Sequence, residues 1–274
     1  MKIMIAGLGL IGGSAAKALR RAGFAPEGWD RPDVLKRAVE TGVVAASAGE
    51  PSGYDVVFVA LPPDVAMDWM DQTAFREGAI VADFCGIKGA IERRIYSKPR
   101  SFRYVGCHPM AGREVSGLDN AQETLFDGAS MIMTHCPQTD EGAVHTLEWL
   151  YTAMGFGQIK HCTAAYHDDK IAYTSQLAHV VSNAYVKSAA ADGFPGFTGG
   201  SFQDMTRIAG VDEEIWTRLY MLNLPAVTRE LETLIEHLTP YLDALRAGDE
   251  EKLKALLREG RLRKEELDRE RKIL

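Results

Sequence analysis

The sequence is poor in cysteine. Its four cysteines are Cys85, Cys107, Cys136 and Cys162. Because no two of them form a Cys-x-x-Cys pair, the sequence predicts neither a disulfide framework nor a cysteine-based zinc site, and it suits a reducing cytoplasm. Two histidines, a cysteine and an aspartate lie close together between His161 and Asp168, but we expect no metal ion there.

An excess of positive charge and a long hydrophobic run are also missing. Lys and Arg number 31 against 38 Asp and Glu, a formal net charge of −7. The first 162 residues contain 16 basic and 19 acidic residues and the rest contain 15 and 19, so neither half has the basic footprint of a nucleic-acid-binding protein. No run reaches the roughly 18 apolar residues of a membrane span, and the run Met1–Ala6 is too short for a signal peptide. We therefore expect a cytoplasmic protein without nucleic-acid or membrane partners.

What is present is a globular composition, with 46% hydrophobic and 25% charged residues in 274 positions, enough chain for about two domains. In the first 162 residues, short β-branched runs alternate with helical patterns, which predicts an α/β fold with a doubly wound parallel sheet. The expected strands are Lys2–Ala6, Gly28–Asp30, Asp55–Leu61, Ala79–Phe84, Arg103–Cys107, Ser130–Thr134 and Gly157–His161. The third of these runs is apolar on both faces, as a central strand should be.

After His161 the pattern becomes helical, so we predict a first domain at residues 1–162 and an all-helical C-terminal domain at residues 163–274. We expect one helix at Tyr173–Ala191, a Gly-rich break at Gly193–Ser201, and a helix at Ile215–Leu245 that Pro225 and Pro240 bend or split. From Asp249 onward the mixed charges predict a solvated helix with many ion pairs. The long apolar helices offer more hydrophobic surface than one small domain buries, which predicts a homodimer through this domain.

A Gly-x-Gly-x-x-Gly motif follows the first expected strand directly. Gly7 permits a tight turn, Gly9 lets a pyrophosphate approach the backbone, and Gly12 allows close packing of helix on strand. The free N–H groups of the following helix, which Leu10 and Ile11 begin, then bind the anion. This arrangement predicts a Rossmann-type dinucleotide-binding domain.

Asp30 ends the second expected strand about 20 residues farther on, where an acidic residue binds the adenine ribose. A carboxylate there repels a 2′-phosphate, so we expect NAD as the cofactor. Arg31 can accommodate that phosphate, which leaves NADP as the alternative.

His108 follows the fifth expected strand in the string Gly-Cys-His-Pro-Met-Ala-Gly. Ligands of open α/β sheets bind at the carboxyl ends of the strands. A histidine at that edge, beside a nicotinamide, can accept a hydroxyl proton as hydride leaves the same carbon. His108 is therefore the candidate catalytic residue.

The glycine motif, the His108 string with Ser116-Gly117 after it, and the string Gly199-Gly-Ser-Phe-Gln-Asp-Met-Thr-Arg-Ile-Ala209 together resemble the TyrA family of prephenate and arogenate dehydrogenases. The resemblance covers nearly the whole chain. It implies an NAD-dependent oxidoreductase of tyrosine biosynthesis that oxidatively decarboxylates a cyclohexadienol to a phenol, in a dimer held by the helical domain. It assigns the base that binds the substrate hydroxyl to His108, and it requires no metal.

Ser175, His179 and Asn183 stand at i, i+4 and i+8 in an otherwise apolar helical segment, so they share one helix face. A polar stripe of this kind is expected to be paired or to face a wet site. The resemblance implies that His179, with Ser175 beside it, lies in the substrate pocket. Arg207 is the expected partner of a substrate carboxylate, since a guanidinium binds carboxylates in a bidentate manner, and the resemblance implies that it holds the ring carboxylate.

The chain departs from the family pattern at Gly86, where many members have a serine beside the nicotinamide, and at Gln176, where some have a further histidine. Some other group or a water must therefore orient His108. Arg113 and Glu114 are expected to face the substrate side chain. Glu114 suits the ammonium of arogenate and Arg113 suits the carboxylate of either substrate, so both remain possible, with prephenate preferred.

Two other functions compete with this interpretation. A Rossmann reductase with a helical domain, such as a β-hydroxyacid dehydrogenase, typically relies on a lysine and lacks the His-Pro-Met-Ala-Gly string. A protein that binds NAD without turnover would leave the candidate residues without a shared purpose.

Overall fold

The computed structural model describes residues 1–113 and 115–273. The chain divides into two compact units, Met1–Leu224 and Pro225–Leu274. The predicted domain boundary at residue 162 lies inside the first unit and stays a prediction. Among the described residues, no helix is both long and apolar enough to cross a membrane.

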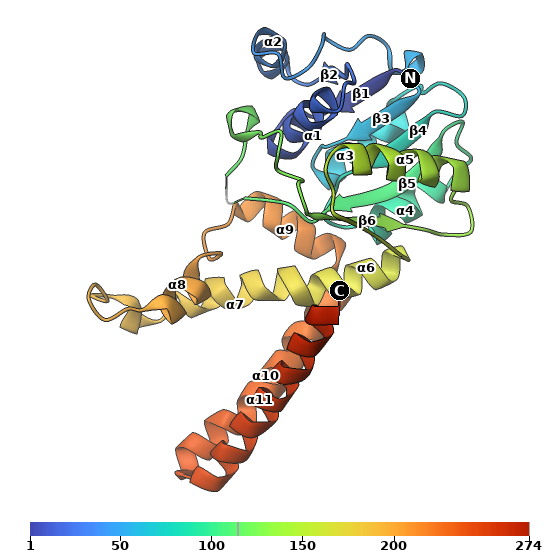
Figure 1. Ribbon diagram of the computed structural model, residues 1–274. Helices are drawn as coiled ribbons and strands as arrows, with labels where there is room; N and C mark the ends of the chain where they lie inside the picture. The colour runs from blue at the N-terminus through green and yellow to red at the C-terminus, as the bar shows by residue number, and fades with distance from the viewer. Residues whose placement is uncertain (114, 274) are drawn as a thin grey trace. The chain divides into compact units, whose positions relative to one another are not determined.

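A seven-stranded sheet forms the centre of the first unit, with the strand order β2-β1-β3-β4-β5-β6-β7 (Figure 1). The strands are β1 (Ile3–Ala6), β2 (Glu27–Trp29), β3 (Val56–Val59), β4 (Ile80–Asp83), β5 (Arg103–Pro109), β6 (Ser130–Thr134) and β7 (Gln158–Cys162). All seven predicted strands are confirmed, each within two residues of its predicted ends.

The predicted parallel sheet is confirmed except at one pair, where β6 runs antiparallel to β5. A parallel pair needs a crossover connection of a dozen or more residues, usually a helix. Between β5 and β6 the described residues form only the short 3-10 turn Leu118–Asn120. The chain therefore returns along the sheet in the opposite direction before β7 pairs in parallel with β6.

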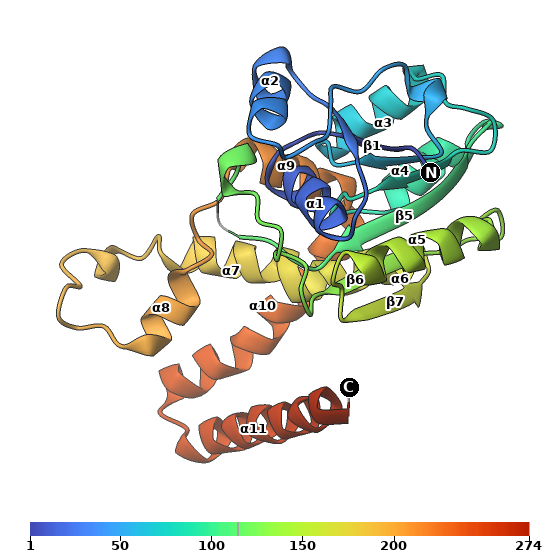
Figure 2. The ribbon, with the colours of Figure 1, turned by 45° about the horizontal axis from the view of Figure 1, so that its top comes forward.

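Helices cover both faces of the sheet because the strands alternate their side chains between two cores. Val56 and Phe58 of β3 point into one core, and Val57 and Val59 point into the other. The first core is covered by α1 (Leu10–Arg21), α2 (Pro32–Glu40) and α5 (Glu141–Ala153), and the second by α3 (Pro63–Gln72) and α4 (Gly89–Tyr96). Figure 2 shows α1 and α5 over the same face. The doubly wound arrangement is confirmed.

After β7 the first unit continues as helices. These are α6 (Ala164–Ile171), a π-helical segment (Ala172–Gln176), α7 (Leu177–Tyr185), α8 (Gly200–Thr206) and α9 (Glu213–Leu222). The first three form one continuous rod, yellow in Figure 1. The predicted helix Tyr173–Ala191 was wrong at both ends, since the rod begins at Ala164 and α7 ends at Tyr185. Ser188 stops the rod because its hydroxyl accepts the N–H of Ala190 and starts a separate 3-10 turn, Ala189–Ala191.

The second unit consists almost wholly of α10 (Leu224–Ala247) and α11 (Glu250–Ile273). The predicted split near Pro225 is confirmed, because α9 ends at Leu222 and α10 begins at Leu224. Pro240 does not split the helix, because α10 continues through that residue, and the predicted bend there stays a prediction. Helix α11 carries the expected ion pairs, among them Arg263 with Glu266 at 2.9 Å.

Candidate active site

The glycine motif forms the turn between β1 and α1, and two of its glycines are sterically required. Gly7 has a φ of +92°, in the left-handed region that favours glycine. A Cβ on Gly12 would lie 1.8 Å from the Gly7 carbonyl oxygen. Gly9, which precedes α1, is different: a Cβ there would meet no atom within 4 Å, and no side chain caps the helix. The turn is therefore closely packed at Gly7 and Gly12 and open at Gly9, beside the helix N-terminus.

Asp30 holds this turn to the end of β2. Its carboxylate accepts the backbone N–H of Leu8 at 2.6 Å through one oxygen and that of Arg31 at 2.6 Å through the other. The residue that precedes α2 is Arg31, which is exposed. Asp30 thus lies beside the glycine turn.

His108 lies at the same edge of the sheet as the glycine turn. In the register of the parallel strands, Ala6 pairs with Val59, Val59 with Asp83, and Asp83 with Gly106. Gly7 directly follows Ala6 at one end of this series of paired residues, and His108 lies two residues after Gly106 at the other end.

The ring of His108 faces Gly86, the position of the missing family serine. A Cβ on Gly86 would lie 3.8 Å from His108 Nε2 and 3.9 Å from Leu219 of α9. Nε2 therefore points toward the edge of the sheet, and α9 lies close by.

The other ring nitrogen of His108 is hydrogen-bonded. Its Nδ1 lies 2.9 Å from Nε2 of His167, and Nδ1 of His167 lies 2.7 Å from Oδ1 of Asp168. Both partners belong to α6, which begins after Thr163, a residue whose hydroxyl caps the helix by accepting the N–H of Tyr166 at 3.2 Å.

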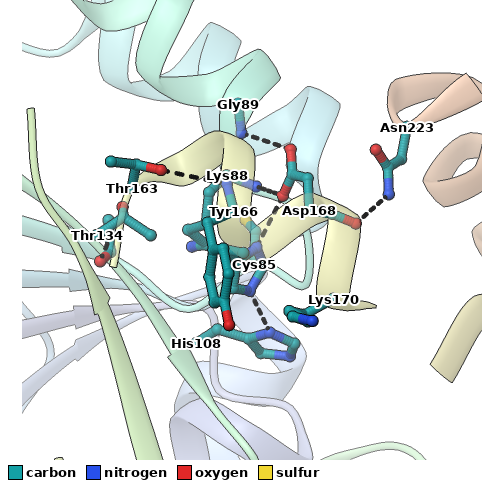
Figure 3. A network of polar contacts seen from close by, with 12 residues as sticks. Cys85, Lys88, Gly89, His108, Thr134, Thr163, Tyr166, Asp168, Lys170 and Asn223 are labelled. Atoms are coloured by element: carbon teal, nitrogen blue, oxygen red, sulfur yellow. Dashed lines mark hydrogen bonds and ion pairs between the residues drawn. The ribbon is translucent and has the colours of Figure 1, made fainter. Parts of the chain in front are cut away.

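Asp168 also completes the start of α4, which no side chain of its own caps. It accepts the N–H of Lys88 at 2.9 Å and that of Gly89 at 2.8 Å, and its carbonyl accepts from the Asn223 amide at 2.9 Å (Figure 3). A Cβ on Gly89 would lie 2.8 Å from Oδ2 of Asp168, so only glycine fits there. Asp168 is thus held by two segments that are distant from it in sequence.

A fully buried ion pair between Lys88 and Asp83 lies beneath His108. Asp83 also accepts the Tyr104 hydroxyl at 2.6 Å, and the Lys88 ammonium donates to the Cys107 carbonyl at 2.5 Å. Burial, followed by the charges of His167 and Lys88, holds the pKa of His108 well below its ordinary value. His108 is therefore neutral at neutral pH, as a proton acceptor must be.

A cavity of about 460 Å³ brings together two of the predicted substrate residues, Arg113 and His179. The ring of His179 stacks on Trp216 of α9, with centroids 3.8 Å apart. Its Nδ1 bonds to the carbonyl oxygen of Ser175 at 2.9 Å. Asn183, the third residue of the polar stripe, instead donates to the Ala209 carbonyl at 3.1 Å and holds the segment after α8.

Arg207 lies at the C-terminal end of α8 and is exposed. Ile208 and Gly210 line the cavity, whereas Arg207 and His108 are not among its lining residues. Glu114 lies outside the described residues. Gln176 is buried and joins α9 to the rod through its bond to the Leu219 carbonyl at 3.1 Å.

Sequence reasoning missed the role of His167 and Asp168, which it weighed only as metal ligands. It also missed the buried pair Lys88–Asp83 and the stacking residue Trp216. Within the described part of the chain, no three His, Cys, Asp or Glu side chains are grouped so that they could hold a metal ion. The available signal was the adjacent His-Asp pair at the start of a helix, but its partner lies 59 residues away in His108.

Two family models match this chain. Residues 15–158 match "Prephenate dehydrogenase, nucleotide-binding domain" and residues 163–259 match "Prephenate dehydrogenase, dimerization domain". A prephenate dehydrogenase of Lactococcus lactis is 25% identical over 95% of this chain and 75% of the relative.

Two solved structures are similar in fold over nearly their whole length. An arogenate dehydrogenase of Synechocystis has a TM-score of 0.82 at 27% identity and covers 97% of this chain and 100% of its own. A prephenate dehydrogenase of Aquifex aeolicus, in complex with hydroxyphenyl propionate and NAD+, has a TM-score of 0.83 at 26% identity, with 97% and 98% covered.

Proposed function

Since this chain belongs to the prephenate dehydrogenase family, we propose that it catalyses the NAD-dependent oxidative decarboxylation of prephenate to 4-hydroxyphenylpyruvate, in tyrosine biosynthesis. The observation that carries the proposal is the position of His108. Its Nε2 faces the edge of the sheet that the glycine turn also occupies, and its pKa is lowered so that the ring is neutral.

The glycine turn fits a dinucleotide. The open space at Gly9, in front of the uncapped start of α1, suits a pyrophosphate, whose charge the helix N-terminus stabilises. Gly7, Gly12, Leu10 and Ile11 shape this turn, and Asp30 beside it favours NAD over NADP. When bound, NAD accepts the hydride from the ring carbon that bears the hydroxyl.

His108 accepts the hydroxyl proton at Nε2 in the proposed reaction. The carbon–oxygen bond becomes a carbonyl as the proton and the hydride leave. The bond between the ring and its carboxylate then breaks and carbon dioxide departs. The bonding electrons pass through the ring to the carbonyl oxygen, which takes the proton back from His108 to give an aromatic phenol. General base catalysis of this kind contributes about 10²- to 10⁴-fold.

The substrate is a dianion, and a chain with net charge −7 offers it no favourable overall field. Local cations must therefore bind it. We assign the ring carboxylate to Arg207 and the side-chain carboxylate to Arg113 of the cavity, with Ser175 and His179 beside the substrate.

Arogenate is the second candidate substrate, because Asp212 lines the same cavity as Arg113 and suits an ammonium group. Asp212 also caps α9 by accepting the N–H of Ile215 at 3.0 Å, which leaves it less available. We therefore favour prephenate. A reductase that uses a lysine is disfavoured, because Lys88, whose charge acts on His108, is fully buried and paired.

We further propose a cytoplasmic homodimer held by the helical domain. Helix α10 exposes four large apolar residues at helical spacing, Ile235, Leu238, Leu242 and Leu245, and a second subunit would cover them. Light scattering at micromolar concentration should give the mass of a dimer, and a monomer would contradict this assignment.

The deciding assay follows reduced nicotinamide absorbance with NAD or NADP and with prephenate or arogenate. We expect turnover with NAD and prephenate. His108→Gln should lower kcat about 10²- to 10⁴-fold, whereas His145→Gln, at an exposed histidine of α5, should not. Absence of turnover with either substrate would refute the proposed function.

A further inference from the structure

The hydrogen-bonded row Asp168–His167–His108 determines where each proton lies. Asp168 Oδ1 accepts from the Lys88 N–H as well as from His167, and Oδ2 accepts from the Gly89 N–H. A carboxylate only accepts hydrogen bonds. Nδ1 of His167 therefore carries a hydrogen and donates it to Asp168.

The tautomer of His167 in turn determines the tautomer of His108. A neutral imidazole has one N–H, so Nε2 of a neutral His167 is an acceptor. Its partner at 2.9 Å, Nδ1 of His108, must then be the donor. That leaves Nε2 of His108 without a hydrogen, as a base requires.

We propose that His167 and Asp168 are positioning residues that fix His108 in the tautomer with hydrogen on Nδ1, so that Nε2 faces the substrate as a proton acceptor. This inference rests on the proposed function for the role of that acceptor. The two residues act through His108 and touch neither the substrate nor the reacting atoms.

The surroundings keep both rings neutral and fixed. The His167 side chain is fully buried, and burial lowers its pKa, partly offset by its bond to Asp168. The charged groups that act on the two rings come from β4, from the turn before α4 and from α6: Asp83, Lys88 and Asp168. Lys88 disfavours a further positive charge on either ring. The doubly protonated His167, which would reverse the donor order, is therefore disfavoured.

Gly86 explains why this chain depends on the row. No side chain at position 86 can bond to Nε2 of His108, and a Cβ there would lie 3.8 Å away. Position 86 therefore does not orient the ring from the Nε2 side. The row orients it from the Nδ1 side.

Asp168→Ala tests the proposal because it removes the acceptor that holds a hydrogen on Nδ1 of His167. Without that acceptor His167 is no longer required to present Nε2 as an acceptor, so the hydrogen of His108 is no longer confined to Nδ1. We expect kcat to fall by up to about 10²- to 10⁴-fold with KM and NAD affinity little changed. The control is Asp169→Ala, the same change at the exposed neighbouring residue of α6, which should keep kcat.

A second pair of variants separates positioning from folding. His167→Gln offers a carbonyl oxygen to His108 Nδ1 and an amide N–H to Asp168, so it should retain most of the activity. His167→Leu offers neither and should lose kcat as Asp168→Ala does. If Gln and Leu at this position gave the same kcat, the proposal would be wrong.

The tautomer itself is read from the ¹⁵N shifts of histidine-labelled protein without substrate, with His108 assigned from the His108→Gln variant. The expected result is hydrogen on Nδ1 in the unmodified chain and hydrogen shared between Nδ1 and Nε2 in Asp168→Ala. Hydrogen on Nε2 in the unmodified chain would overturn the inference. Because this measurement needs no turnover, it decides the inference even if neither prephenate nor arogenate is a substrate.

Discussion

The glycine turn permits a prediction that separates folding from cofactor binding. Replacing Gly12 by Ala places a Cβ 1.8 Å from the Gly7 carbonyl oxygen and 2.9 Å from the Ala60 Cβ. Neither atom can rotate away, so the strain exceeds ordinary overpacking, which costs about 1–3 kcal/mol. We expect a loss of about 3 kcal/mol or more, which lowers Tm by roughly 6–12 °C in a chain of this size.

Replacing Gly9 by Ala should lower NAD affinity and leave stability nearly unchanged. A Cβ there meets no atom within 4 Å, so the free energy of unfolding should change by less than about 1 kcal/mol. The same methyl group fills the space that the pyrophosphate would approach. We expect NAD affinity to fall about tenfold or more, equivalent to about 1.4 kcal/mol.

Thermal melting and calorimetric titration with NAD measure the two effects on the same samples. Gly53→Ala is the control, because its Cβ also meets nothing within 4 Å and it lies in the turn before β3, away from the cofactor edge. It should change neither Tm nor NAD affinity. A Gly12→Ala protein that melts like the parent, or a Gly9→Ala protein that binds NAD equally well, would refute this account of the turn.

Three further predictions follow from the site. Arg207→Ala should raise KM for prephenate about 10- to 150-fold, the equivalent of a charge-assisted bond of about 1.5–3 kcal/mol, and leave the NAD Kd unchanged; an unchanged KM refutes the assignment. The folded-state pKa values of His108 and His167 are lowered, so the unfolded chain binds protons first as pH falls below about 6.5. Urea unfolding should therefore show stability decreasing from pH 7 to pH 5, by up to about 1.4 kcal/mol per pH unit for each histidine. His108→Gln should reduce that slope, and an unaltered slope would contradict a lowered pKa of His108 in the folded chain. Lys88→Met should cost about 3–5 kcal/mol by leaving Asp83 buried and unpaired, and adding Asp83→Asn should recover part of it; no recovery would mean that the unpaired charge is not the cause.

The features predictable from the sequence are those whose signals are local. The strands, the glycine turn and the position of Asp30 each depend on a short run and its spacing. The register of the parallel strands then places His108 at the edge of the glycine turn without further information. These elements could be placed because alternation of apolar residues and tight-turn glycines act over a few positions.

The features that escaped prediction depend on distant partners or on small changes of helical register. Asp168 bonds to backbone N–H groups 79 and 80 residues away, and nothing in its neighbours reveals them. The π-helical segment changes the register within the rod. Ser175 consequently contributes its carbonyl to His179, a contact that helical spacing alone does not foresee.

Asp30 and Asp168 illustrate how an acidic chain can organise a site for an anionic substrate. Each carboxylate accepts two backbone N–H groups, and each joins segments that are distant in sequence. Donors placed in this way offset the negative charge locally, which limits its repulsion of a dianion. In the proposed site the field at the substrate then depends on Arg207 and Arg113, while the carboxylates set geometry. Removing the carboxylate of Asp168 should therefore change where the proton of His108 lies more than it changes how tightly the substrate binds, and the split between kcat and KM in Asp168→Ala measures that difference.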